Sequence, residues 1–432
     1  MIAGRPRPAE GSQPGDALRA WTVEALRIGA TPIGIVAWFV LIVHLWVLLA
    51  PHFHPPPSPR RWNDALVYVQ AASSALKNPG HLYDAAVLQL TRPRAVRAFI
   101  YPPGALLPFL GLVPLASSGG AWLAAAVWAV IDAMALFAAL TLLARRFQLS
   151  WPVIGCLLAF ISFTRPIWWE LGSGQVNGLV LLLIAVAMSD LRAARSGVGL
   201  GLALAVKPIA PVVLLVPLLR RRLSPVLVGL ACFLVMNAIF VPLIGLHGVM
   251  TYLTQVLPFF SHYVIHDRSN VSLPNVFQSF LGTGPLSRRA AFSHPVPDTG
   301  IAVAALWLVR AAICLVALVI VLTRRINIEM AFVLVLATVP ALAATVWPHY
   351  FVLVLPLALA LFAARPAGMI IAVGGLLLML VFGPLSVLWL SWLVLWPAAA
   401  FLWLQMDRST SAFAAAAEVP PALSQGPRGG AE

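Results

Sequence analysis

Asp64 is the acidic residue best placed to do chemistry, because it is the first acid after the opening apolar span and lies beside a polar, helix-patterned segment. Acidic side chains are scarce, with 14 Asp and Glu among 432 residues. A carboxylate at a membrane interface can act as a general base, and partial burial would raise its pKa toward a useful range. Neighbouring Asn63 could orient it. An Asp at this place can instead be a helix N-cap.

Other polar side chains offer binding groups. Lys207 and His349 are cations that could stabilise the negative charge of a phosphate, although on residue type alone an interfacial lysine and a helix-end histidine are the favoured interpretations. Gln175 and Asn177, with Glu170 before them, can either bind hydroxyl groups or pin their own turn.

Charged residues elsewhere have simpler interpretations. Arg268 lies in a polar loop, where an arginine usually meets lipid headgroups. Asp132 and Arg310 fall deep in apolar segments, so we expect them to face the protein interior and to pair with each other.

No metal site is predicted. His52 and His54, with His44 nearby, lie in a Pro-rich setting that supplies no fixed carboxylate ligand, and the first polar loop has no Asp-x-Asp motif. Three cysteines fall inside predicted spans and read as small apolar side chains: Cys156, Cys232 and Cys314. We therefore expect metal-independent chemistry without a cofactor.

The elements that must position these groups are transmembrane helices. The chain is 61% hydrophobic and 10% charged, with a mean hydropathy of +0.93. Long Leu/Ala/Val segments without the alternation of barrel strands indicate an all-α, polytopic membrane protein. The net charge of +14 comes largely from arginines in short loops, and only two of the 28 basic residues are lysines. Positive-inside orientation explains this charge without nucleic acid.

Orientation follows from the basic clusters. Placing them all on the cytoplasmic side predicts about twelve spans with both termini inside. The clusters are Arg145/Arg146, Arg192/Arg195, Arg220–Arg222, Arg324/Arg325, Arg365 and Arg408. The predicted spans are 29–50, 119–144, 150–166, 173–190, 196–207, 208–220, 223–245, 300–323, 327–346, 348–364, 367–383 and 385–405.

Two segments are ambiguous. Residues 197–219 resemble one helix, but Lys207-Pro208 and Pro211 interrupt it, which favours two short helices with Lys207 at the outer tip. Residues 101–115 carry four prolines and favour a re-entrant or interfacial helix. A rival arrangement spans 101–115 once, keeps 197–219 as one helix, and places Arg145 and Arg192 outside.

The predicted organisation is a cytoplasmic segment 1–28, a transmembrane domain 29–405, and a tail 406–432 of Ala/Pro/Gly-rich composition that we expect to be disordered. External loops cover about 51–118 and 246–299. Within the first loop, Leu66, Val69 and Leu76 share one face of an interfacial helix over Asn63 to Lys77.

In this topology Asp64, the Glu170–Asn177 turn, Lys207, the 267–275 stretch and His349 all lie near the outer membrane face. A transporter tends to place such groups near the midplane, in paired broken helices. An enzyme that acts on a lipid-linked substrate places them at the interface.

An ordered set of short motifs carries a family resemblance. It comprises Asp64-Ala-Leu-Val-Tyr68-Val, Leu82-Tyr83, Tyr101-Pro102-Pro103, Gly174-Gln175-Val176-Asn177, Val206-Lys207-Pro208 with Pro211, and Trp347-Pro348-His349-Tyr350. The chain resembles the bacterial GT-C glycosyltransferases of family 87, which are polyprenyl-phosphate-mannose-dependent mannosyltransferases of the phosphatidylinositol mannoside type, with arabinofuranosyltransferases among their relatives.

The resemblance implies a GT-C fold, an outward-facing site, a lipid-phosphate sugar donor and inversion at the anomeric carbon. It also implies that Asp64, the acid of the first external loop, is the base. Our candidates for binding the donor phosphate or sugar are Lys207, His349, Gln175, Asn177, Glu170, Arg268 and Tyr68. The chain departs from the family where paired histidines and Asn-Gln-Ser are usual, since it has Pro348-His349 and Asn270-Val271-Ser272. Trp168, Trp169 and Trp347 can stack on sugar, although interfacial aromatic belts are commoner.

The resulting hypothesis is a membrane glycosyltransferase that moves a sugar, mannose first, from a polyprenyl-phosphate donor to a glycolipid or cell-envelope glycan on the outer face of the cytoplasmic membrane. Its expected partners are the donor, the acceptor and membrane lipids, without nucleic acid. One carboxylate is enough, because the leaving phosphate departs as an anion, unlike the two-carboxylate hydrolysis of glycosides. Two alternatives are a lipid or sugar transporter and a noncatalytic envelope-assembly scaffold.

Overall fold

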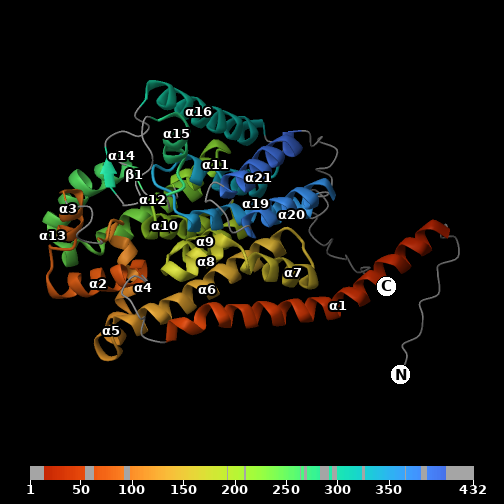
Figure 1. Cartoon of the computed structure of the whole chain (residues 1–432), viewed down its shortest axis with the longest axis horizontal. Coiled ribbons are helices and arrows are strands. Elements are labelled where there is room, and N and C mark those ends of the chain that lie inside the picture. The colour runs from red at the N-terminus through yellow and green to blue at the C-terminus, as the bar shows by residue number, and fades with distance from the viewer. Residues whose placement is uncertain are drawn as a thin grey trace, which may run out of the picture.

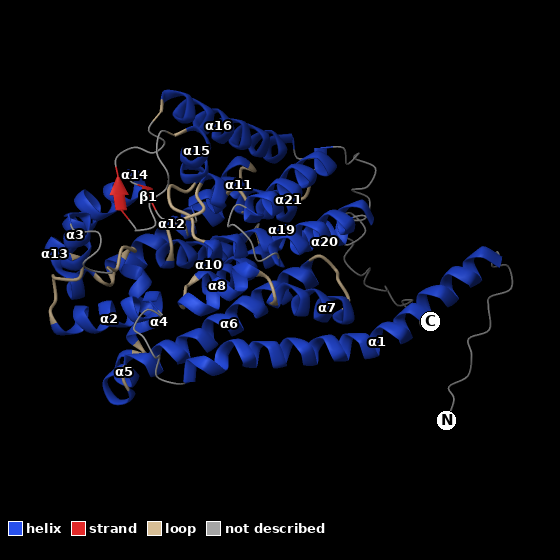
Figure 2. Ribbon diagram, viewed as in Figure 1, coloured by secondary structure: helices blue, strands red, loops and turns tan. Residues whose placement is uncertain are grey.

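The computed structural model describes residues 14–53, 63–91, 98–191, 193–208, 211–262, 264–266, 270–282, 291–293, 299–323, 326–364, 366–380 and 387–404. Within these ranges the fold is a helical bundle, as expected (Figures 1 and 2). The only strands in this part of the chain are β1 (Val264–His266) and β2 (Ala291–Ser293), which lie between α14 and α16 in the sequence and pair antiparallel.

The helices of the first half run from the long N-terminal helix to the kinked helix before the second loop. They are α1 (Pro14–Leu49), η1 (Ala50–Phe53), α2 (Asn63–Lys77), α3 (Asp84–Thr91), η2 (Pro103–Leu106), α4 (Leu107–Leu110), α5 (Val113–Gly119), α6 (Ala121–Arg146), α7 (Trp151–Ser162), α8 (Arg165–Ser173), α9 (Asn177–Ala187), η3 (Met188–Asp190), α10 (Ala194–Val206), α11 (Pro211–Leu219), α12 (Leu223–Ala238) and α13 (Val241–Thr251).

The second half continues with a π-helix and ends in a pair of apolar helices. Its elements are η4 (Tyr252–Val256, the π-helix), α14 (Leu257–His262), α15 (Leu273–Leu281), α16 (Gly300–Thr323), α17 (Ile328–Leu336), α18 (Val339–Leu342), η5 (Pro348–Val354), α19 (Leu355–Ala364), α20 (Pro366–Leu380) and α21 (Val387–Leu404).

Helix α1 lies along one side of the bundle, and its N-terminal half projects beyond the other helices (Figure 1). Helix α1 approaches α7 closely because glycines, which have no side chain, lie at the interface between the two helices. A Cβ on Gly34 would lie 2.7 Å from Cα of Pro152, and one on Gly155 would lie 2.7 Å from Nε1 of Trp38. Backbones that approach through small residues are typical of helix packing in membranes.

Most described helices lie near the predicted spans, but α1 begins at Pro14 instead of residue 29, α8 extends to Ser173 beyond the predicted end at 166, and many helices are short. Three are long and apolar enough to cross a membrane: Thr31–Leu49 of α1, α6 and α16. Two bent pairs raise the number to five, α7 with α8 at 69° and α12 with Val241–Phe259 at 101°. Shorter apolar helices of 10–17 residues occupy six of the seven remaining predicted positions, and α11, with 9 residues, occupies the seventh, so the count of twelve crossings stays a prediction. Breaks at proline and glycine shorten these helices below the length of a straight span.

Both ambiguous segments are broken. The chain leaves α10 at Lys207, whose backbone is extended (φ −147°, ψ 120°), and resumes as α11 at Pro211, so 197–219 is not one helix. Residues 101–115 fold into η2, α4 and the start of α5 instead of a single crossing. The predicted interfacial helix Asn63–Lys77 forms with those bounds as α2.

One predicted pair is wrong. Asp132 is buried as expected, but its Oδ1 accepts a hydrogen bond from Leu179 N at 3.2 Å. Arg310 instead donates to the carbonyl oxygens of Ala341 (3.3 Å) and Ala343 (3.1 Å). Arg310 lies on α16, where the carbonyls freed at the end of α18 accept its guanidinium, so it needs no carboxylate.

The turn between α8 and α9 positions the interior polar groups. Gly174 ends α8 in the left-handed region (φ 65°, ψ 49°), where glycine carries no steric penalty. A Cβ on Gly174 would lie 2.5 Å from Cβ of Ala65, the residue after Asp64. The close approach of α2 to this turn therefore depends on glycine at 174.

We predict that Gly174→Ala lowers the thermal unfolding midpoint of the detergent-purified protein. The left-handed backbone costs roughly 1–2 kcal/mol for a non-glycine residue, and overpacking against Ala65 costs about 1–3 kcal/mol more. The matched control is Gly172→Ala on α8, because a Cβ there meets nothing within 4 Å. Equal midpoints for the two variants would contradict this account of the turn.

Candidate active site

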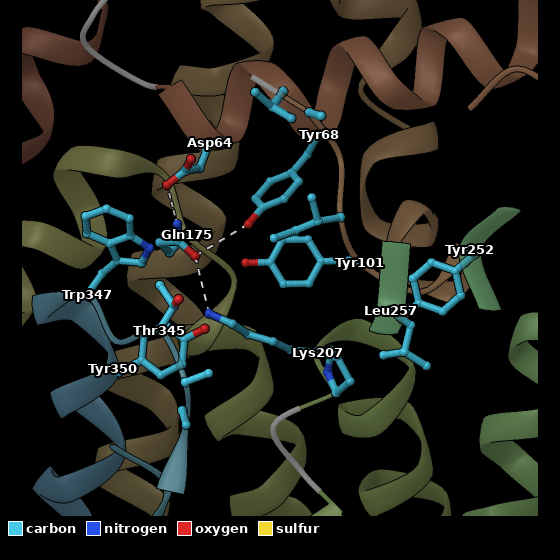
Figure 3. Close-up of a pocket in the computed structure, with 16 residues that line it drawn as sticks. Asp64, Tyr68, Tyr101, Gln175, Lys207, Tyr252, Leu257, Thr345, Trp347 and Tyr350 are labelled. Atoms are coloured by element: carbon cyan, nitrogen blue, oxygen red, sulfur yellow. Dashed lines mark hydrogen bonds between the residues drawn. The ribbon is translucent and has the colours of Figure 1, made fainter. Parts of the chain in front are cut away.

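A cavity of about 330 Å³ lies where six separate segments meet. Its walls come from α2, from the stretch before η2, from the α8–α9 turn, from the α10–α11 break, from η4 with the start of α14, and from the stretch that leads into η5. The lining includes Asp64, Tyr68, Tyr101, Gln175, Lys207, Tyr252, Leu257, Thr345, Trp347 and Tyr350 (Figure 3). Sequence-distant groups thus converge on one space.

The cavity has a polar end and an apolar end. Asp64, Gln175 and Trp347 lie together at one end, and Tyr252 and Leu257 lie at the other (Figure 3). Tyr252 begins the π-helix η4 and Leu257 follows it. Single π-turns of this kind are frequent at functional sites because they re-aim side chains.

Asp64 is half-buried in the first turn of α2 and faces Gln175. The Gln175 amide nitrogen donates a hydrogen bond to Asp64 Oδ2. Its amide oxygen accepts from Tyr68 Oη and from Lys207 Nζ, both at 3.4 Å. The acid, the amide and the cation therefore form one connected chain of polar side chains.

Lys207 is fully buried at the break between α10 and α11. Its Nζ donates to Asn177 Oδ1 at 2.8 Å and lies 4.3 Å from the ring centroid of Tyr350 and 5.8 Å from that of Tyr101. With Gln175, two acceptors are found for a group that has three donors. Lys207 also lines the cavity, so its ammonium can contact an anion bound there.

Tyrosines form much of the wall. Tyr68 packs against Tyr101 with ring centroids 5.5 Å apart and against Phe109 at 4.7 Å. Burial is the main cause that raises the pKa of both Tyr68 and Tyr101 well above the usual tyrosine range. Both phenols are therefore neutral at physiological pH, so they offer hydroxyl hydrogen bonds and ring faces without charge.

A second polar layer lies beside the cavity without lining it. The Glu170 carboxylate accepts from Asn177 N (2.8 Å), Asn177 Nδ2 (2.7 Å) and Gly178 N (3.3 Å). Asn177 N and Gly178 N are the first backbone N–H groups of α9, which otherwise lack helical partners. Of the two roles predicted for Glu170 and Asn177, the geometry supports pinning the turn.

His349 also belongs to this second layer. It is 3% exposed, stacks on Tyr350 at 5.2 Å between ring centroids, and is absent from the cavity lining. Neither ring nitrogen has a hydrogen-bond partner among the described residues. Its carbonyl oxygen accepts from Asn177 Nδ2 at 3.5 Å.

Two predicted groups fall outside the described residues: Arg268 and the side chain of Asn63. Trp347 lines the cavity, whereas Trp168 is 56% exposed on α8, as an interfacial tryptophan would be. Asn270 Oδ1 accepts hydrogen bonds from Ser272 N and Val346 N, which ties the chain before α15 to the stretch before η5.

Sequence reasoning missed the aromatic part of the wall. Tyr252 was not singled out, and Tyr101 and Tyr350 were noted only within motifs. Their rarity is a signal that could have found them, since four of the six tyrosines in the chain line this one cavity. In the ranges that the structure covers, no three His, Cys, Asp or Glu residues are grouped as a metal site.

This arrangement can perform acid–base chemistry next to a phosphate. The Asp64 carboxylate can accept a proton, the buried Lys207 ammonium can bind an anion, and the aromatic rings can stack on a sugar. The apolar end can receive an apolar chain.

Comparison with known proteins points the same way. The profile of glycosyltransferase family 87 matches residues 99–346, more than half of the chain. An alpha-(1->3)-arabinofuranosyltransferase of Corynebacterium glutamicum is 26% identical over 186 residues, covering 41% of this chain and 42% of the relative. Proteins of the same name from two Mycobacterium tuberculosis strains are 29% identical over 172 residues, covering 37% of this chain and 38% of each relative.

The matched stretch therefore spans less than half the length of these relatives. Asp64 precedes the region of the family match, and His349 and Tyr350 follow it, whereas Gln175 and Lys207 lie within it. With more than half of its length matched by the profile, the chain belongs to glycosyltransferase family 87.

Proposed function

We propose that this protein is an integral-membrane, inverting glycosyltransferase that moves a sugar from a polyprenyl-phosphate donor to a glycolipid or cell-envelope glycan at the outer face of the cytoplasmic membrane. The observation that carries the proposal is the meeting of Asp64 and Lys207 in one cavity through Gln175. The match to glycosyltransferase family 87 favours a catalytic use of this carboxylate and ammonium over a transporter or a scaffold.

In the proposed reaction, the acceptor hydroxyl attacks the anomeric carbon while Asp64 takes the hydroxyl proton. A new glycosidic bond forms as the bond between the anomeric carbon and the phosphate oxygen breaks. The electron pair leaves with the polyprenyl phosphate, whose growing charge is stabilised by Lys207. Because the leaving phosphate departs as an anion, no second carboxylate is required.

The cavity volume and lining are consistent with a substrate that has a polar sugar phosphate and an apolar lipid chain. About 330 Å³ accommodates a sugar phosphate near Asp64, Gln175 and Lys207. The apolar end at Tyr252 and Leu257 suits the first part of a lipid chain. Mannose is the first sugar to test, and arabinofuranose is the second because the matched relatives are named arabinofuranosyltransferases.

We predict that Asp64→Asn strongly slows transfer of radiolabelled mannose or arabinofuranose from the polyprenyl-phosphate donor in membranes that contain the protein. General base catalysis contributes about 100- to 10,000-fold, so the rate should fall within that range. The matched control is Asp84→Asn, since Asp84 is an exposed acid of the same external loop paired with His81. Full activity of Asp64→Asn, or no covalent product from the wild type with either sugar, would refute the proposal.

Two substitutions of Lys207 separate the effect of its charge on turnover from the effect of its shape. We expect Lys207→Met to lower turnover about 100- to 1,000-fold, the usual effect of removing one stabilising donor from developing negative charge. Lys207→Arg keeps the charge and should retain more activity. The measurement is turnover at saturating donor, with monodispersity checked by size exclusion. A folded Lys207→Met protein with unchanged turnover would show that this ammonium does not serve the leaving phosphate.

We further propose that transfer needs no divalent cation, because Lys207 supplies positive charge at the cavity. Transfer by purified protein should therefore persist after extensive treatment with EDTA. Loss of activity under EDTA, followed by recovery on adding Mg²⁺ or Mn²⁺, would show that a metal takes part.

A further inference from the structure

The side chain of Gln175 is held from both sides. Its amide nitrogen donates to Asp64, and its amide oxygen accepts from Tyr68 and Lys207. Its backbone carbonyl also accepts from Trp128 Nε1 at 2.9 Å, which fixes the turn beneath the side chain. Gln175 is 3% exposed, so these protein contacts take up most of its hydrogen-bonding capacity.

The two donors on the amide oxygen decide which way the amide faces. An ammonium can only donate, so Lys207 requires an acceptor. The raised pKa of Tyr68 keeps its phenol protonated, and it is therefore a second donor toward the same atom. A flipped amide would turn its N–H groups toward Lys207 and its oxygen toward the Asp64 carboxylate, so the amide nitrogen must face Asp64.

From this geometry we propose that Gln175 is the positioning residue of the general base: it holds the Asp64 carboxylate toward the acceptor and keeps it ionised, instead of reading the sugar. This inference rests on the proposed role of Asp64. A hydrogen bond to the charged form of an acid favours that form. Through the shared amide, the position of Lys207 is also tied to that of Asp64.

Several titratable groups surround the Gln175 amide, and each could contribute to the pH dependence of the transfer rate. Asp64 and Tyr68 face it from α2, Lys207 from the end of α10, and Tyr101 and Tyr350 from the cavity walls. Behind them stand Glu170 of α8, Asp132 of α6 and His349 of η5. Only Asp64 must lose its proton for the proposed reaction, so activity should fall as pH drops through its pKa.

The test compares Gln175→Glu and Gln175→Met with the wild type in purified, reconstituted protein, using the radiolabelled polyprenyl-phosphate donor. A carboxylate at 175 cannot donate when ionised and places a like charge beside Asp64, whereas methionine removes the donor at similar size. Both changes should move the acid limb of the pH–rate profile to higher pH. Turnover should fall about 10- to 100-fold because the base is no longer held in place. KM for donor and acceptor should stay within about two-fold, since uniform substrate binding is kept.

The matched control is Gln278→Met, the same substitution at a buried glutamine of α15 that does not line the cavity. It should leave turnover and the acid limb unchanged. Thermal unfolding of all variants shows which ones fold. If Gln175→Met does not fold, Gln175→Glu carries the test, because it keeps the side-chain size and an acceptor for Lys207.

Each outcome decides one question. A large rise in KM with an unmoved acid limb would mean that Gln175 reads the sugar, which overturns the inference. Unchanged turnover and acid limb in both variants would overturn it as well. If Asp64→Asn stays active, the proposed function is wrong. If Asp64→Asn is inactive but the Gln175 variants leave the acid limb of the pH–rate profile unchanged, only the inference about Gln175 is wrong.

Discussion

The site is organised by one constraint: a lysine is buried in a protein with very few charged groups, and its ammonium must be satisfied. An unpaired charge in an apolar interior costs far more than a helix break or a special turn. Lys207 meets this demand with Gln175, Asn177 and the face of Tyr350. The break after α10, the α8–α9 turn and the start of η5 therefore have to lie together.

The partners of Lys207 form two layers of polar residues with different roles. On the cavity side, Gln175 connects Lys207 to Asp64. On the inner side, Asn177 connects Lys207 to Glu170, which caps the first N–H groups of α9. The inner layer fixes the turn so that the outer layer can present a carboxylate and a cation to a substrate. Gly174 lets α2 approach closely enough to complete the chain.

The fold class, helix α2 and the break after α10 could be predicted from the sequence, because each depends on residues that are close together in the chain. Composition gave the all-α membrane class, periodicity gave α2 with its bounds, and Lys207-Pro208 marked the break after α10. The association of Asp64, Gln175 and Lys207 followed from topology and family resemblance. The second-layer position of His349, the aromatic wall with Tyr252, and the carbonyl partners of Arg310 depend on packing between distant segments, which no local pattern encodes.

We propose that the lipid-phosphate donor binds between Asp64 and Lys207, and the decisive measurement is a structure of the protein in a lipid nanodisc with a non-reactive donor analogue. A phosphate oxygen should lie within about 3 Å of Lys207 Nζ, the distance of a hydrogen bond. The anomeric carbon should lie on the Asp64 side of the cavity, and the lipid chain should leave past Tyr252 and Leu257. An analogue whose phosphate lies away from Lys207, or whose sugar lies outside this cavity, would contradict the account.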